Sequence, residues 1–229
     1  MAQYVIATTK SWNIENSKKL METFPNETFH LITEKEKLTI EFLNEINPRY
    51  IFFPHWSWII PQEIFDSYEC IVFHMTDLPF GRGGSPLQNL IVRGIYETKI
   101  SAIRVDKGVD TGPIYLKRSM DISTGNADEI LSRVSTVVFN EMIPEFMNEN
   151  LIPQPQEGTV VTFKRRTPEQ SEIPEGLTQR QIYDYIRMLD GEGYPTAYKD
   201  IDDMRIYFRN ARLDGEKVCA AAEITRRDE

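Results

Sequence analysis

The sequence has few of the residues that build metal centres and disulfide frameworks. Its 229 residues include two cysteines and three histidines. Cys70 and Cys219 form neither a Cys-x-x-Cys pair nor a Cys/His zinc spacing, and both lie in segments with strand character. We therefore expect two small buried thiols and no metal site.

Long apolar runs are also missing. No stretch approaches the roughly 20 residues that a helix needs to span a bilayer. The first residues, MAQYVIA, carry neither the basic region nor the cleavage site of a signal peptide. These features predict a cytoplasmic protein without membrane contact.

Positive charge is in deficit: 26 Lys and Arg stand against 35 Asp and Glu, for a formal net charge of −9. Proteins that bind a phosphate backbone use clustered Lys and Arg, so this balance predicts no nucleic-acid partner. A hydrophobic share of 41% indicates a globular chain that can bury a core.

Apolar runs and helical periodicities alternate along the first two thirds of the chain. This alternation predicts an α/β fold with a Rossmann-like, doubly wound and mainly parallel sheet, whose ligands bind at the carboxyl ends of the strands. Strands are expected at residues 4–8, 50–53, 70–74, 99–105 and 114–120. A long amphipathic helix is expected over about residues 126–148.

Pro153 and Pro155 mark a connector, which predicts a boundary near residue 152. Residues 1–152 are then the catalytic domain, and residues 153–229 are a linker and a small C-terminal subdomain. About 50 residues form a weak core by themselves, so the subdomain is expected to pack on the first domain.

The subdomain is predicted to contain one helix and a hairpin. Thr178 and Gln181 have the spacing of a capping box at a helix start. Asp214-Gly215 is a turn signal between segments 204–213 and 217–224.

Two stretches carry candidate chemistry. Residues 72–86 read VFHMTDLPFGRGGSP, so His74 ends a buried strand and meets a glycine-rich loop. Residues 106–113 read DKGVDTGP between two predicted strands. Each alone has a structural interpretation, as a packed histidine or a turn. Together, the carboxylate of Asp110 could orient the imidazole of His74 and raise its basicity.

This pair of stretches resembles the folate-dependent formyltransferases, whose pattern runs Asn-x-His-x-Ser-x-Leu-Pro, Gly-x-x-Pro and Asp-x-Gly-Pro-Ile. The match covers roughly residues 50–150. It falls on His74, Thr76, Leu78, Pro79, Pro86, Asp110, Gly112, Pro113 and Ile114. The resemblance implies an N-formyltransferase with 10-formyltetrahydrofolate as co-substrate and with His74 and Asp110 as catalytic residues.

One position departs from the pattern, because Val72 stands where the family has Asn. In the family that amide is taken to hold the formyl oxygen, a role that valine cannot fill. His55 follows the preceding strand and is a candidate replacement, although a structural role for it stays open. The resemblance assigns folate binding to Trp56, Ser57, Trp58, Ile59, Asp106 and Gly108.

The C-terminal third resembles the tail of sugar N-formyltransferases, nearest to those of pseudaminic-acid-type pathways. FKRRTPE at residues 163–169 and YPTAY at residues 194–198 carry the resemblance. It implies that the formyl acceptor is a nucleotide-linked amino sugar, such as a UDP-4-amino-4,6-dideoxy sugar. The assigned substrate-binding residues are Lys10, Trp12, Asn13 and Arg82.

Several alternatives stay open. The acceptor could be methionyl-tRNA, glycinamide ribonucleotide or a carrier-bound amino acid. The absence of the family Asn also allows a catalytically inactive relative that binds folate or sugar nucleotides. A homodimer is left open.

Overall fold

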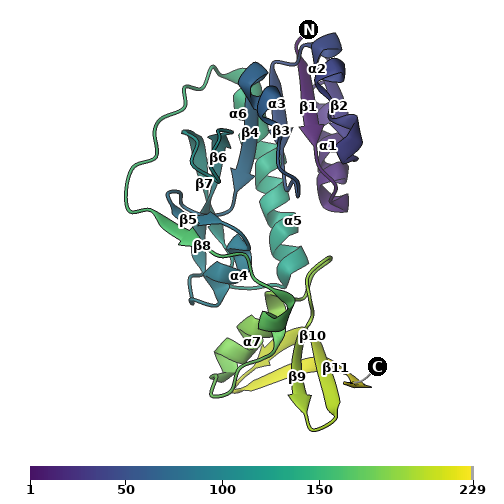
Figure 1. Ribbon diagram of the computed structural model, residues 1–229, viewed down its shortest axis with the longest axis vertical. Helices are drawn as coiled ribbons and strands as arrows, with labels where there is room; N and C mark the ends of the chain where they lie inside the picture. Colours follow the sequence, from purple (N-terminus) through teal and green to yellow (C-terminus); the bar gives the residue numbers. More distant parts are fainter. Residues whose placement is uncertain (228–229) are drawn as a thin grey trace. The chain divides into compact units, whose positions relative to one another are not determined.

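The computed structural model describes residues 1–227 and has the predicted α/β fold (Figure 1). The strands are β1 (Gln3–Ala7), β2 (Thr28–Ile32), β3 (Tyr50–Phe53), β4 (Cys70–His74), β5 (Phe80–Gly83), β6 (Glu97–Arg104), β7 (Ile114–Asp121), β8 (Val161–Phe163), β9 (Ala197–Ile201), β10 (Met204–Asp214) and β11 (Lys217–Arg226). The helices are α1 (Ser11–Thr23), α2 (Ile40–Ile46), α3 (Gln62–Ser67), α4 (Pro86–Ile91), α5 (Ala127–Val137), α6 (Ile143–Asn148) and α7 (Gln179–Arg187), with short turns η1 (Lys35–Lys37), η2 (Val138–Met142) and η3 (Pro168–Ser171).

Six strands form the main sheet, in the order β2-β1-β3-β4-β6-β7. The pairs β1–β2, β1–β3 and β3–β4 are parallel, and β6 runs antiparallel to β4. The predicted mainly parallel sheet is therefore confirmed. Because β3 and β4 are neighbours, the loops that follow them leave the same edge of the sheet.

Both faces of this sheet are buried, which explains the continuous apolar runs of its strands. On one face, Val5 and Ile51 belong to a core cluster covered by α2 and α3. On the other face, Tyr4 stacks near Phe52, whose ring lies 5.6 Å from that of Phe146 in α6. No helix in the described part of the chain is both long and apolar enough to cross a membrane.

The long helix expected over residues 126–148 is interrupted. It consists of α5, the π-helical turn η2 and α6, and Pro144 stands in the first turn of α6. Proline lacks a backbone N–H and its ring crowds the preceding turn, so a regular α-helix cannot continue through it. The wider π turn accommodates the proline without ending the helix.

The described chain forms two compact units. Unit 1 contains Met1–Arg82, Lys99–Met120 and Ser132–Thr162, and unit 2 contains the remainder. The domain boundary near residue 152 stays a prediction, but residues 153–162 belong to unit 1 by their contacts.

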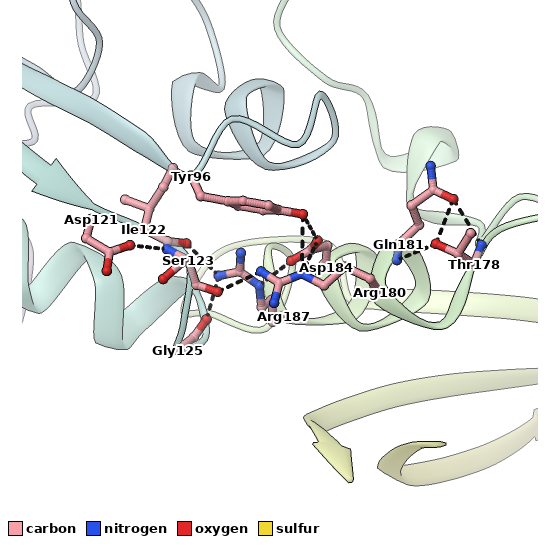
Figure 2. A network of polar contacts seen from close by, with 10 residues as sticks. All are labelled: Tyr96, Asp121, Ile122, Ser123, Gly125, Thr178, Arg180, Gln181, Asp184 and Arg187. Carbon is pink, nitrogen blue, oxygen red and sulfur yellow. Dashed lines mark hydrogen bonds and ion pairs between the residues drawn. The ribbon is translucent and has the colours of Figure 1, made fainter. Parts of the chain in front are cut away.

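In unit 2, helix α7 is joined to the turn between β7 and α5 by a buried polar network (Figure 2). Its centre is the carboxylate of Asp184, which accepts from Nε of Arg187 at 2.7 Å, Nε of Arg180 at 2.9 Å and the hydroxyl of Tyr96 at 2.5 Å. Arg187 also donates to two backbone carbonyls of the turn, at 3.0 Å each. The predicted capping box of Thr178 and the hairpin of β10 and β11 are present.

Candidate active site

His74 and Asp110, predicted as the catalytic pair, meet at the end of β4. Nδ1 of His74 lies 3.5 Å from Oδ2 of Asp110, and the two side chains are 10% and 19% exposed. Nε2 of His74 lies 2.8 Å from the carbonyl oxygen of Gly81. Both ring nitrogens thus face oxygen acceptors, and a proton on each satisfies both contacts.

The loop between β6 and β7 presents Asp110 in a left-handed conformation. Its φ is 53°, in a region that aspartate tolerates better than most residues. The loop is tightly packed, because a Cβ atom at Gly112 would lie 1.7 Å from the carbonyl oxygen of Arg104. The Asp110-Thr111-Gly112 sequence therefore suits the backbone of this loop, and it also places the Asp110 carboxylate beside His74.

Three residues assigned to the substrate, at the start of α1, lie beside the β3–α3 loop that carries His55. The Asn13 amide, 2% exposed, donates to Oγ1 of Thr8 at 2.9 Å and to the carbonyl of Pro54 at 3.0 Å. Lys10 lies over the Trp12 ring, whose edge approaches His55 at 6.3 Å between ring centroids. The amide of Asn13 thus joins two loops, a role that the sequence did not reveal.

His55 stands beyond the end of β3, with φ of 57°. Burial, with a smaller effect of the Lys10 charge, lowers the pKa of His55 to about 4. Its ring is therefore neutral near pH 7 and carries one N–H donor. Phe53 pairs with Val72 across β3 and β4, so His55 and His74 each lie two residues beyond a paired position. Its role at the formyl oxygen stays a prediction.

The residues predicted to bind folate lie in two loops. Trp56 and Val105, which precedes Asp106, pack on the same core cluster. The indole N–H of Trp56 is buried without an acceptor among residues 1–227. A pterin ring carries the nitrogen and carbonyl acceptors that such a donor needs, so this loop fits the co-substrate. Asp106 lines a cavity of about 270 Å³ and accepts from the Gly108 N–H at 3.0 Å.

The other predicted folate residues are exposed. Ile59 is 92% and Trp58 38% exposed, and Ser57 also faces solvent. Arg82 donates through Nε and Nη2 to Oε1 of Gln156, at 3.0 and 2.7 Å. Arg82 thus has a partner inside the protein, and Gln156 had no signal in the sequence. Among the described residues, no three or more His, Cys, Asp or Glu side chains are placed to hold a metal ion.

Two family models match the chain. The model described as "Formyl transferase" matches residues 7–145, a range that includes His74 and Asp110. The model described as "Methionyl-tRNA formyltransferase, C-terminal domain" matches residues 168–225. The chain belongs to the formyltransferase family. The predicted enzyme class and the co-substrate of that class, 10-formyltetrahydrofolate, are confirmed at the level of the family.

Comparison with individual formyltransferases shows which members of the family this chain resembles. A methionyl-tRNA formyltransferase from Clostridium thermocellum is 54% identical with a TM-score of 0.95, over 99% of this chain and 100% of that one. The methionyl-tRNA formyltransferase of Thermodesulfovibrio yellowstonii is 28% identical over 178 residues, covering 75% of this chain and 57% of the relative. This chain spans about half the length of the curated relatives it matches. A Shewanella sugar N-formyltransferase shares the fold at 16% identity and a TM-score of 0.72, over 92% and 97% of the two chains.

These relatives contradict the predicted partners. A nucleotide-sugar substrate and the absence of a nucleic-acid partner were expected, but the relative that is 54% identical over 99% of this chain, and the curated relative that covers 75% of it, are methionyl-tRNA formyltransferases. The prediction was wrong because net charge averages over the whole surface. A chain of net charge −9 can still present a local cluster of Lys and Arg to a phosphate backbone.

Proposed function

We propose that this protein transfers a formyl group from 10-formyltetrahydrofolate to the amino group of methionyl-tRNA. The observation that carries the proposal is the close pairing of His74 with Asp110 in a chain that is 54% identical to a methionyl-tRNA formyltransferase over 99% of its length. Support for the acceptor comes from that identity and from the match of residues 168–225 to the C-terminal domain of such enzymes.

The co-substrate supplies an activated formyl group, whose carbon the acceptor amine attacks while the bond to the carrier nitrogen breaks. His74 stabilises the negative charge on the formyl oxygen by donating from Nε2, after the contact with the Gly81 carbonyl opens. The carboxylate of Asp110, 3.5 Å from Nδ1, holds the ring in place on its other side. One hydrogen-bond donor at such an oxygen lowers the activation barrier by about 2.7–4 kcal/mol. In the alternative role, a ring that is unprotonated at Nε2 accepts the proton that the attacking amine loses and then gives it to the leaving nitrogen.

The proposal is tested by following tetrahydrofolate release when purified protein meets 10-formyltetrahydrofolate and methionyl-tRNA. Turnover is expected with methionyl-tRNA and not with N-acetylmethionyl-tRNA, whose amine is blocked, or with uncharged tRNA. Equal release with the blocked substrate would mean hydrolysis rather than transfer. No release with any of the three would overturn the proposed activity.

His55 is expected to supply the donor that Val72 cannot. Replacing His55 with Gly, which accepts a φ of 57°, removes the ring without straining the backbone. The expected result is a kcat about 10²-fold lower with a smaller change in KM, as for removal of an oxyanion donor. Val72→Asn in the same chain should recover part of the rate. Normal turnover of His55→Gly would show that His74 or water holds the oxygen.

A cationic segment in unit 2 is expected to contact RNA. Lys164 and Arg165 are exposed, and within residues 1–227 neither makes an ion pair. The amide of Asn89 donates to the carbonyl of Lys164 at 3.0 Å, and Gly84 leaves room for Arg165, since a Cβ there would lie 2.6 Å from the Cβ of Arg165. The segment is therefore held in place rather than loose.

Replacing Lys164 and Arg165 together with Ala should raise KM for methionyl-tRNA and leave kcat nearly unchanged. The slope of log KM against log salt should fall by about 1 for each lost phosphate contact. Lys18→Ala with Lys35→Ala, two exposed cations of unit 1, is the matched control. If both double variants raise KM equally, only the net charge of the protein matters for tRNA binding. If replacing Lys164 and Arg165 leaves KM unchanged, this segment does not contact the tRNA.

A further inference from the structure

A short segment after residue 152 runs from the start of β7 to the residue before β5, and we call it the strap. We define the strap as residues 153–161. Gln154 exchanges two backbone hydrogen bonds with Ile114 at the start of β7, at 2.7 and 2.8 Å. Further on, the N–H of Val161 donates to the carbonyl of Pro79 at 3.3 Å. The strap is therefore fixed at both ends within unit 1.

Gln156 lies between these two anchors, and its amide makes four hydrogen bonds. Its Oε1 accepts from Nε and Nη2 of Arg82, at 3.0 and 2.7 Å. Its Nε2 donates to the carbonyls of Asp110 and Gly112, each at 2.8 Å. An amide offers two N–H donors and two lone pairs, so every hydrogen-bonding group of this side chain is used.

The two segments that Gln156 joins are those that hold the His74 ring. Arg82 directly follows Gly81, whose carbonyl accepts from Nε2 of the ring. Asp110 places its carboxylate beside Nδ1. One amide thus connects the side chain of Arg82, the residue after Gly81, with the backbone of the Asp110 loop on the other side of the imidazole.

We propose that Gln156 is a positioning residue, which sets the separation of the Gly81–Arg82 segment and the Asp110 loop and thereby the seating of His74 between them. The expected change in kcat rests on the proposed function, whereas the expected change in the position of the His74 ring does not. Asp110 needs such support because its left-handed backbone, with φ of 53°, is a conformation that the surrounding structure must hold.

The chemistry of the amide explains why this side chain suits the position. Glutamate would keep the acceptor for Arg82 but would lose both donors and place a negative oxygen against two carbonyls. Leucine has a similar size and removes all four hydrogen bonds. Gln154 provides a matched control on the same strap, because its side chain is exposed and, among residues 1–227, bonds only to the carbonyl of Ile152, at 3.4 Å.

The kinetic arm of the test compares Gln156→Leu, Gln156→Glu and Gln154→Leu with the unmodified protein. Both changes at Gln156 should lower kcat about tenfold or more, with KM for the folate changed less, since an error of about 1 Å in a catalytic group can cost 10²-fold. Gln154→Leu should turn over normally. If all three variants lose activity equally, the strap is only a structural element and the proposal fails.

The second arm does not need activity. In protein labelled with ¹⁵N-histidine, the ring nitrogens of His74 report the hydrogen bonding of Nδ1 and Nε2. In Gln156→Leu and Gln156→Glu the Nδ1 signal should move toward its position in Asp110→Asn, and in Gln154→Leu it should stay. A protein that shows these shifts without turnover would contradict the proposed function and support the positioning role. Unchanged Nδ1 signals in both Gln156 variants would overturn the positioning role whatever the rates.

Discussion

Replacing His74 or Asp110 with Asn is expected to lower kcat about 10²-fold or more, because each change removes a group that controls the proton or the charge at the reacting centre. The two effects should not add. Asp110 acts through the ring of His74, 3.5 Å away, so the double variant should be hardly slower than His74→Asn. Single-turnover rates with methionyl-tRNA test both the loss of rate in each single variant and the lack of additivity in the double variant.

His30→Asn is the matched control for this prediction. His30 lies on β2, three strands away from β4 in the sheet, and its ring contacts the side chain of Gln3 at 2.8 Å. Strands are spaced about 4.8 Å apart, so this change should not reach the candidate site. Circular dichroism should show all variants folded. A folded His74→Asn protein with an ordinary rate would remove His74 from the mechanism.

Replacing Asp184 with Ala is expected to lower the free energy of unfolding by about 3–5 kcal/mol, because it leaves a buried guanidinium without its counter-charge. The Arg187 side chain is 1% exposed, and its Nε donates to Asp184 at 2.7 Å (Figure 2). Burial, and then the hydrogen bond to Asp184, raise the pKa of Tyr96, so this third partner also stays a neutral donor. Urea unfolding and hydrogen exchange in α7 measure the loss.

A double variant separates the charge from the packing. Asp184→Leu with Arg187→Met removes both buried charges and keeps similar volumes, so it should recover much of the stability lost in Asp184→Ala. Asp203→Ala, at an exposed position between β9 and β10, should change stability by less than about 0.5 kcal/mol. If the double variant is as unstable as Asp184→Ala, the loss comes from the missing hydrogen bonds of this network and not from an unpaired buried charge.

Local patterns predicted the parallel core well. Residues 50–53 and 70–74 are strands as expected, because an uninterrupted apolar run is typical of a strand covered on both faces. The edge strand β2 was not predicted. Its residues, Thr28–Ile32, are mostly half-buried and carry a weaker apolar signal, so they become a strand through pairing with β1. Likewise β5 and β8 are short and depend on each other.

The sequence by itself determined the fold class, because apolar spacing is a property of neighbouring residues. The resemblance of its motifs indicated the family and implied His74 and Asp110 as the catalytic pair. Only the tertiary structure decided what surrounds that pair. The hydrogen bonds around the pair join residues that are 5 to 74 positions apart in the sequence. They include the contact of His74 with the Gly81 carbonyl, the bonds of the Asn13 amide and the four bonds of Gln156. Such contacts leave no periodic trace in a sequence, since they depend on where folding brings separate loops together.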